Sequence, residues 1–556
     1  MKYKDLVDVY EQLAGTSKRL EKTQILAAFL PLLKGREELV YLFRGRAFAE
    51  YDSREFGIST QLVIKAIARA SGSAPEKVVE EFTKRGDLGD VALFLLKRKK
   101  QASLSSKELT AEHVLEVLQK LASIEGFGAV DRKLGFIVEL LSSASGAESV
   151  YLIRTLLGDL RIGVADSIIL DSIIQQYFAD SSVKEKVYES YAMLNDFAAI
   201  LKMAVKGARA FEHVVLIPGR PVQVMLAVKA MSLQEGFDVC GKPAAFEHKY
   251  DGFRLIISAE GKEVRLFTRR LEDVTKQFPD IVLAVKDHIK ATSYILDAEI
   301  VGFDPRSGKY MPFEAISQRI KRKYSIEELQ KELPVEVNVF DALYVDGESL
   351  LDLRFRERRE LLGRIVVEER RKIKLATQLV TDSLKEAERF YAEALELGEE
   401  GVMVKNLDAP YRPGRYVGYM AKVKPVIADL DLVVVGGEYG TGKRAGGLTS
   451  FIVACRSNGE FLEVGRVSSG LKEKSEEGTS YGELDEVLQP LILSSDGNSV
   501  RVKPKIVVSV TYQNIQKSPS YSSGYALRFP RITRVRFDRG VKDIASLDEI
   551  KKEAKN

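Results

Sequence analysis

Hydrophobic residues recur every three or four positions through the first two hundred residues, and this spacing predicts amphipathic helices. The repeat is clearest in residues 3–13, 61–70, 111–124 and 187–205. Polar or glycine-bearing joints separate these stretches, and Thr110 directly precedes one of them as a candidate N-cap. We therefore expect an all-α domain over residues 1–215.

The pattern changes at residues 217–227, where two prolines and a glycine break the helical repeat and indicate a linker. Beyond it, short stretches rich in β-branched and aromatic residues predict strands. These stretches are residues 244–250, 253–258, 263–268, 294–303 and 335–345. Helical periodicity returns only at 352–372 and 383–398, so we expect an α+β domain with largely antiparallel sheets over residues 216–425.

A third region begins near Pro425 and consists of short predicted strands. Asn458-Gly459 lies between two alternating apolar runs, which is a strong signal for a β-hairpin turn. A segment of this size with such strands suits an OB-fold β-barrel, which we expect over residues 426–556. A helical pattern at 546–556 closes the chain.

The composition fits a globular protein of several domains. The 556 residues suggest roughly three or four domains, and the 45% hydrophobic content supports large cores. The net charge of +4 does not by itself indicate a nucleic-acid-binding protein. Residues 501–540, however, hold nine Lys or Arg against one acid, Asp538. Such an excess attracts a polyanion, although a solvated face balanced by acids elsewhere explains the charge about as well.

The cysteines and histidines exclude two common kinds of site. The two cysteines and four histidines lack metal-binding spacing, which argues against a zinc site or a disulfide framework. The first residues are amphipathic rather than a signal peptide, and no apolar run is long enough to span a bilayer. We therefore expect a cytoplasmic protein with no membrane partner, and a monomer as the default state.

Residues 437–443, GEYGTGK, match the glycine and lysine positions of a phosphate-binding loop. Arg444 stands where that motif needs Ser or Thr to hold magnesium. A predicted strand follows, where a helix N-terminus should supply amide donors. We reject a motor ATPase on these grounds and interpret the stretch as a glycine-rich connection between strands.

Lys249 lies in the stretch EHKYDGFRL. The pair Asp251-Gly252 is a two-residue hairpin turn signal, which would bring Arg254 on the returning strand close to Lys249. An ordinary lysine has a pKa of about 10.4, so its neutral form costs on the order of 4–5 kcal/mol at pH 7. Neighbouring cations, a metal ion and partial burial all favour a neutral amine, which can attack phosphorus. The four-residue pattern alone favours an ordinary strand-end lysine, so the interpretation depends on its companions.

Charged and aromatic residues follow Lys249 in an order that favours phosphoryl transfer. The segment TRR at 268–270 offers cations to a phosphate. Glu299 lies within an apolar strand, where a carboxylate is costly unless it binds a metal or a hydroxyl. Phe340 offers a flat surface for stacking a base, and Glu400 lies at the start of a buried strand.

Lys422 and Lys424 share one face of a later predicted strand and complete the set. The ordered segments KYDG, TRR, DAEIVGFD, VFDALYVDG, EEGVMVK and KVK resemble the motifs of the nucleotidyltransferase superfamily, which includes ATP-dependent DNA ligases, RNA ligases and mRNA capping enzymes. The helical first region, the PGRPVQVMLA linker and the closing LRFPRITRVRFDRG segment resemble archaeal-type ATP-dependent DNA ligases in particular. The resemblance covers nearly the whole chain.

The resemblance implies ATP and Mg²⁺ as cofactors and nicked double-stranded DNA as the substrate. Lys249 would attack the α-phosphate of ATP, forming lysyl-AMP and releasing pyrophosphate. AMP would pass to the 5′-phosphate at the nick, and the 3′-hydroxyl would then displace AMP and seal the strand. Such a ligase serves DNA replication, repair and recombination.

The resemblance also implies roles around the nucleotide. Glu247 would lie beside the adenine, and Phe340 would stack on it. Glu299 would contact the ribose or a metal ion, and Glu400 is a candidate magnesium ligand.

Cationic side chains would bind the phosphates, again by resemblance. Arg254 and Arg269 would face the nucleotide or the nick phosphate. Lys422 and Lys424 would contact the α-phosphate. Arg415, in the loop PYRPGRYVGY, matches a nucleotide-contacting arginine.

The first and last regions would act on the DNA and on the leaving group. Arg528 and Arg531 would orient the pyrophosphate in the first step, which requires the barrel to close over the site and later rotate away. The helical region would grip the duplex through Arg154, Arg161 and their neighbouring glycines, with little sequence preference.

Two positions depart from the family pattern. Tyr419-Met420 stand where a tryptophan usually precedes the Lys422 strand, from which we expect altered packing rather than lost chemistry. A sliding clamp is a candidate partner, but the comparable docking segment from Gln101 to Leu104 lacks the usual aromatic pair. Clamp binding is therefore expected to be weak or to use another surface.

Two other functions stay open at this point. An RNA ligase or a capping guanylyltransferase would use the same central motifs, but neither needs a long helical domain around duplex DNA. A non-catalytic DNA-binding scaffold would not need the complete set of site residues.

Overall fold

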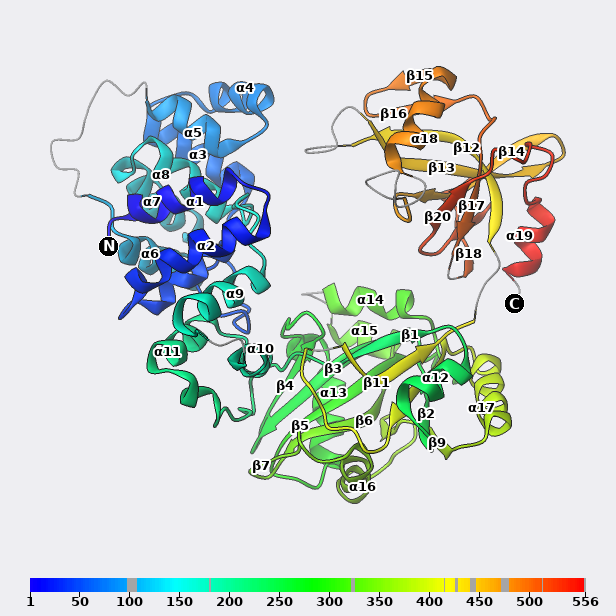
Figure 1. Ribbon diagram of the computed structural model, residues 1–556. Coiled ribbons are helices and arrows are strands. Elements are labelled where there is room, and N and C mark those ends of the chain that lie inside the picture. Colours follow the sequence, from blue (N-terminus) through cyan, green and yellow to red (C-terminus); the bar gives the residue numbers. More distant parts are fainter. Residues whose placement is uncertain are drawn as a thin grey trace. The chain divides into compact units, whose positions relative to one another are not determined.

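The computed structural model of the protein describes residues 1–97, 108–179, 182–321, 326–414, 416–425, 429–440, 447–471, 480–512 and 514–554. The chain forms two compact units, Met1–Lys424 and Pro425–Asn556 (Figure 1). The first unit holds a helical region followed by a region with two β-sheets, and the second unit is rich in strands. The fold class expected from the sequence is confirmed, whereas the domain bounds 1–215, 216–425 and 426–556 stay predictions.

The helical region starts with α1 (Tyr3–Ala14) and runs to α11 (Phe197–Lys206). Between them lie α2 (Arg19–Phe29), α3 (Thr60–Ser71), α4 (Pro75–Arg85), α5 (Leu88–Leu96), α6 (Ala111–Ser123), α7 (Ala129–Ser143), α8 (Gly146–Leu156), α9 (Asp166–Tyr177) and α10 (Val183–Leu194). Their apolar faces meet in one continuous core. The Thr110 hydroxyl accepts a hydrogen bond from the His113 N–H at 3.3 Å and caps α6, as the sequence predicts.

The long helical pattern at 187–205 is interrupted in the structure. Asn195 adopts a left-handed conformation with φ of 49° and ends α10. The Asp196 carboxylate then accepts a hydrogen bond from the Ala199 N–H at 3.0 Å and caps α11. Apolar periodicity runs through the junction, so only the Asn-Asp pair could have indicated the break.

Two β-sheets form the centre of the following region (Figure 1). The five-stranded sheet has the order β1 (Leu226–Ala230), β11 (Tyr416–Val423), β10 (Gly401–Asn406), β2 (Ala244–Lys249) and β9 (Gln378–Thr381). The six-stranded sheet has the order β4 (Glu263–Thr268), β3 (Phe253–Glu260), β5 (Ser293–Gly302), β6 (Val335–Val345) and β7 (Glu348–Ser349), with β8 (Ile373–Leu375) beside β6. The β1–β11 and β6–β8 pairs are parallel and the other described pairs are antiparallel.

Helices cover one face of each sheet. Helices α12 (Leu233–Cys240) and α17 (Leu384–Glu396) pack on the five-stranded sheet. Helices α13 (Pro279–His288), α14 (Phe313–Lys321) and α16 (Phe355–Ile365) pack on the six-stranded sheet, and α15 (Ile326–Glu332) follows α14. A smaller apolar cluster joins the two uncovered faces, where Ile256 and Ile295 of one sheet meet Met420 of the other.

Strand alternation decides which side chains lie between the sheets. On β3, Phe253 and Leu255 belong to the core under the helices, whereas Ile256 belongs to the cluster between the sheets. Arg254 shares the face of Ile256 because side chains alternate along a strand. By the same rule Asp297 and Glu299 of β5 share the face of Ile295, so charged groups gather between the sheets.

The Asp251-Gly252 pair connects the two sheets and does not close a hairpin, so that prediction is wrong. Strand β2 pairs with β9 and β10, whereas β3 pairs with β4 and β5. A Cβ atom at Gly252 would lie 2.3 Å from the Ile300 carbonyl oxygen. The glycine is therefore needed for close backbone approach at the crossing rather than for turn conformation.

The second unit contains one seven-stranded sheet and a separate hairpin. Its strands are β12 (Leu430–Tyr439), β13 (Leu448–Ser457), β14 (Glu460–Val467), β15 (Ile492–Asp496), β16 (Ser499–Val502), β17 (Val507–Thr511), β18 (Ile515–Lys517), β19 (Tyr525–Leu527) and β20 (Arg531–Val535). Helices α18 (Tyr481–Leu488) and α19 (Leu547–Glu553) pack against the sheet. The arrangement agrees with an OB-fold, and an Ile532 N–H···O=C Ser469 hydrogen bond of 3.0 Å brings β20 beside the end of β14. Full closure of the barrel stays a prediction.

Two turn predictions fall in this unit. Asn458 and Gly459 both have positive φ, at 47° and 88°, and join β13 to β14 in the predicted hairpin. Strands β12 and β13 are antiparallel neighbours. Residues 441–446, including Arg444, lie outside the described residues.

Candidate active site

A cavity of about 860 Å³ is lined by residues from both sheets of the first unit. The sequence-predicted residues in its wall are Glu247, Lys249, Arg254, Arg269, Glu299, Phe340 and Lys422. The strand register explains why they lie close together. Met403 of β10 lies opposite Glu247 of β2 on one side and Lys422 of β11 on the other. Arg254 and Glu299 are cross-strand partners in the other sheet.

Lys249 ends β2 and forms an ion pair with Glu400. The same Glu400 oxygen receives the Lys424 ammonium at 2.6 Å. The Glu400 backbone N–H donates to the Lys249 carbonyl at 2.9 Å, which fixes the two residues side by side. One half-buried carboxylate therefore stands between two ammonium groups.

The charges of this cluster shift the pKa values of its members. Burial alone would raise the pKa of Glu400, but the Lys249 and Lys424 ammonium groups outweigh it and lower that pKa to about 2. Burial and the nearby Lys249 charge lower the pKa of both Lys422 and Lys424. The cluster is thus a concentration of positive charge with a single ionised carboxylate, which suits a polyphosphate.

Glu299 is held in a different environment. Burial raises its pKa to about 7, although Lys249 and Arg254 partly oppose the shift. None of the described residues donates a hydrogen bond to its carboxylate. A desolvated carboxylate without a hydrogen-bond donor is stabilised when it binds a metal ion or a ligand hydroxyl.

Glu247 lies 2% exposed in the cavity wall, with its carboxylate fixed from two sides. The Lys405 ammonium is 2.5 Å from one oxygen, and the Gln378 amide donates to the other at 2.9 Å. The Lys405 nitrogen also lies 4.3 Å from the centre of the Phe340 ring. The Phe340 ring and the fixed Glu247 acceptor therefore lie in one part of the cavity. Together they could bind the face and the edge of a base.

Arg254 does not present an open cation to Lys249, which corrects the expected environment. Its Nε and Nη2 atoms donate to the two oxygens of Asp297 at 2.8 and 2.5 Å. Its Nη1 donates to the Met225 carbonyl at 2.9 Å. Lys424 is instead the cation linked to Lys249, because both ammonium groups contact the same Glu400 oxygen.

Asp297 and Gln378 were not singled out by the sequence argument. Asp297 could have been found, since it stands two positions before Glu299 and therefore on the same strand face. Gln378 carries no such signal, because its partner Glu247 is 131 positions away.

Three family models match the chain. They are "DNA ligase N terminus" over residues 2–174, "ATP dependent DNA ligase domain" over 224–424 and "ATP dependent DNA ligase C terminal region" over 444–539. The DNA ligase of Nanoarchaeum equitans is 46% identical, with 99% of this chain and 98% of that protein covered. The DNA ligase of Thermococcus onnurineus is 41% identical over 99% of this chain and 97% of that protein.

The chain belongs to the ATP-dependent DNA ligase family. A solved structure named "Pmar-Lig_PreS3" shares the fold of this ligase, with a TM-score of 0.56 and 18% identity over 95% of this chain and 99% of that one. The recognition made from the ordered motifs is confirmed, and the RNA ligase, capping enzyme and scaffold alternatives are set aside.

The remaining predicted site residues of the ligase are dispersed. Arg415 lies outside the described residues. Arg528 and Arg531 belong to the second unit, where Arg528 is buried and Arg531 is exposed at the start of β20. The Gln101–Leu104 segment also lies outside the described part of the chain.

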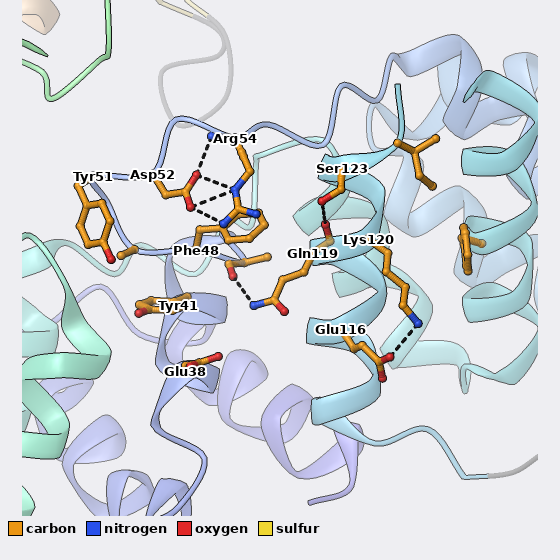
Figure 2. Close-up of a pocket in the computed structure, with 14 residues that line it drawn as sticks. Glu38, Tyr41, Phe48, Tyr51, Asp52, Arg54, Glu116, Gln119, Lys120 and Ser123 are labelled. Atoms are coloured by element: carbon orange, nitrogen blue, oxygen red, sulfur yellow. Dashed lines mark hydrogen bonds and ion pairs between the residues drawn. The ribbon is translucent and has the colours of Figure 1, made fainter. Parts of the chain in front are cut away.

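A second cavity, of about 640 Å³, lies in the helical region of the ligase (Figure 2). Four of its charged side chains form two pairs: Arg54 donates to Asp52, and Lys120 lies 2.7 Å from Glu116. Gln119 donates to the Ala47 carbonyl at 3.1 Å. The wall of this cavity holds three acids against two cations, whereas the wall of the cavity between the sheets holds more cations than acids.

The two arginines expected to hold DNA are engaged with acids. Arg154 lies 3.3 Å from both Asp87 and Asp90, and its side chain is 17% exposed. Arg161 lies 2.8 Å from Asp87 and is 47% exposed. Of the two, only Arg161 has a guanidinium open enough to reach a phosphate as the structure stands.

No described helix is long and apolar enough to cross a bilayer. The described residues contain no cluster of three or more His, Cys, Asp or Glu side chains suited to a metal ion.

Proposed function

We propose that Lys249 is the nucleophile with which this ATP-dependent ligase joins nicked duplex DNA. Its Nζ attacks the α-phosphorus of ATP, an N–P bond forms, and the bond to the leaving pyrophosphate breaks. An oxygen of the nick 5′-phosphate then attacks the AMP phosphorus and frees the lysine. The 3′-hydroxyl finally attacks the activated 5′-phosphate, so that a phosphodiester forms and AMP leaves.

The cationic wall supplies most of the binding energy for the phosphates. Lys422 and Lys424 would contact the α-phosphate, and Arg254 and Arg269 would face the nucleotide or the nick phosphate. Cations fixed before the reaction stabilise the charge that accumulates on transferring phosphoryl groups without costly reorganisation. The low pKa of Glu400 keeps one anion among them, which balances the cluster until the phosphates arrive.

Glu247 and Phe340 form the proposed adenine subsite. Glu247 offers a carboxylate acceptor fixed by Lys405 and Gln378, and the adenine amino group is a donor that complements it. Phe340 would stack on the base. A guanine presents a carbonyl at the corresponding edge and would meet a carboxylate there, which favours ATP over GTP.

Glu299 and Glu400 fit a divalent cation, which we propose to be Mg²⁺. Glu299 lacks a hydrogen-bond donor among the described residues and is partly buried, and carboxylate oxygens together with phosphates are the ligands Mg²⁺ takes. When bound, the ion would supply charge neutralisation for the phosphates. The protein itself contributes the two carboxylates and keeps them in the same cavity as the cationic side chains.

Further roles follow from family membership. Arg415 is proposed to contact the nucleotide, and Arg528 and Arg531 to orient the pyrophosphate. The partner is nicked double-stranded DNA in replication, repair and recombination, and the protein acts as a cytoplasmic monomer. Clamp binding through Gln101–Leu104 would be weak, because that segment lacks an aromatic pair.

One observation carries the proposal: Lys249 ends a strand inside the cavity, paired with Glu400 and surrounded by further cations. The test incubates the protein and Mg²⁺ with radiolabelled ATP, GTP or NAD and resolves the products on a denaturing gel. We expect an acid-labile labelled band from ATP alone, and its loss when unlabelled nicked duplex is added and sealed. A band from GTP alone, or no band, would overturn the proposal.

A further inference from the structure

Tyr411 is fully buried beside the cavity. Its hydroxyl belongs to a ring of hydrogen bonds formed by Tyr411, Asp297, Arg254 and Met225. It donates to an Asp297 oxygen at 2.7 Å and accepts from the Met225 N–H at 3.0 Å. The Arg254 Nη2 atom lies 3.3 Å from the same hydroxyl. No sequence motif assigned a role to this tyrosine.

The ring closes through Arg254. Arg254 binds both oxygens of Asp297, which is 0% exposed, and it also donates to the Met225 carbonyl. Each residue of the ring is therefore bound to at least two others, which restrains the guanidinium. The Arg254 side chain is 18% exposed and lines the cavity, so it is the member of the ring that a ligand could contact.

We propose that Tyr411 is a positioning residue that fixes Asp297 and, through it, the Arg254 guanidinium at the wall of the nucleotide cavity. A buried carboxylate with fewer hydrogen bonds gains freedom to rotate, and a bidentate arginine pair follows its carboxylate. Loss of the Tyr411 hydroxyl would therefore displace a cation that contacts the ligand, although Tyr411 itself does not. This inference rests on the proposed function, because it assigns Arg254 a contact with the nucleotide or the nick.

Met225 connects the ring to the helical region. The linker that precedes it is anchored there: the Gln223 amide donates to the Asn195 side chain at 2.9 Å, and the Asn195 amide donates to the Pro221 carbonyl at 2.8 Å. The next residue after Tyr411 is also engaged, since the Arg412 guanidinium lies 2.9 Å from Asp352 and 3.7 Å from Glu189 of α10. A shift of the linker would be transmitted to the Tyr411 hydroxyl by the Met225 N–H.

The test is a double-mutant cycle of Tyr411→Phe and Arg254→Lys. The readout is single-turnover formation of the labelled protein–AMP adduct as a function of ATP concentration, together with single-turnover sealing of a pre-adenylated nick. Tyr411→Phe removes one hydroxyl and keeps the ring volume. We expect it to weaken the same step as Arg254→Lys by about 5- to 20-fold, and the double variant to be little worse than Arg254→Lys alone.

Tyr10→Phe is the matched control. Tyr10 is equally buried, in the helical region, and its hydroxyl donates to the Leu42 carbonyl at 3.0 Å. It should lower the thermal midpoint without changing either rate. Additive effects in the cycle, or rates for Tyr411→Phe equal to those of Tyr10→Phe, would overturn the inference.

Asp297→Asn provides a second variant if Tyr411→Phe folds poorly. The amide keeps an acceptor for the hydroxyl but loses the charge that holds Arg254, so the same non-additivity with Arg254→Lys is expected. Failure of the proposed function is separately visible, because the wild-type protein would then form no adduct or would carry AMP on a residue other than Lys249.

Discussion

At the cavity, four carboxylates lie in four different environments. Glu400 stands between two ammonium groups, Glu247 is fixed by Lys405 and Gln378, and Asp297 is held by Arg254. Glu299 alone among these four takes no hydrogen bond from the described residues. Glu247 and Asp297 are fixed by their partners, whereas Glu299, and Glu400 once phosphates bind its two lysines, are the acids that we propose to hold a metal ion.

Phe340 gives a residue-scale prediction. Phe340→Ala should raise the ATP concentration needed for half-maximal adduct formation about 10- to 100-fold, because stacking of a base on an aromatic ring contributes roughly 1–3 kcal/mol. The rate at saturating ATP should change little, since the ring does not contact the phosphates. Phe340→Tyr, which keeps the ring, is the control. An unchanged ATP dependence in the alanine variant would exclude stacking there.

His248 gives a pH-dependent prediction. Burial, with Lys374 nearby, lowers its pKa from 6.5 to about 4. Between those values the unfolded chain binds a proton that the folded chain does not, so stability is full above pH 6.5 and falls as the pH approaches 4. The loss is on the order of 3 kcal/mol for a shift of this size.

The thermal midpoint between pH 7 and 4.5 is the measurement for His248. His248→Gln, which cannot gain the proton, should show a shallower decline than the wild type. The exposed His113 is the control, and His113→Gln should keep the wild-type slope. Parallel wild-type and His248→Gln curves would mean that His248 is not buried as described.

At the scale of elements, hydrophobic periodicity predicted the helices and strands, and with them the faces that side chains share. It did not predict strand partners, because β2 pairs with β9 and β10 more than a hundred residues further along the chain. The Tyr411–Asp297 bond spans 114 positions and has no local signature. The hairpin predicted at Asp251-Gly252 was wrong for a related reason, because the same dipeptide occurs both in hairpin turns and in connections between sheets.

Gly252 and Gly261 distinguish those two uses of glycine. Gly261 lies between β3 and β4 with φ of 57° and no atom near its Cβ position, so Asn, which tolerates that conformation, should be accepted there. Gly252→Asn should lower the thermal midpoint and prevent adduct formation, because its Cβ would meet the Ile300 carbonyl. If both variants behaved alike, Gly252 would be an ordinary turn residue and the crossing would be misplaced.

At the scale of the whole molecule, the second unit is expected to act on the first step alone. Arg531→Ala should slow adduct formation from ATP about 10-fold or more, as removal of a cation from the leaving group does, and leave sealing of a pre-adenylated nick nearly unchanged. Arg534→Ala is the matched control, since Arg534 is exposed on the same strand and carries the same charge. Equal effects of both variants on both steps would indicate a general loss of DNA attraction instead.

The central claim is that AMP is carried on Lys249, and localising the adduct tests it most directly. The protein is incubated with ATP and Mg²⁺ under conditions that preserve the phosphoramidate, digested, and sequenced by tandem mass spectrometry. The account predicts AMP on Lys249 and on no other lysine, and an unmodified protein for Lys249→Ala. AMP on Lys422 or Lys424, or on Lys249→Ala protein, would contradict it.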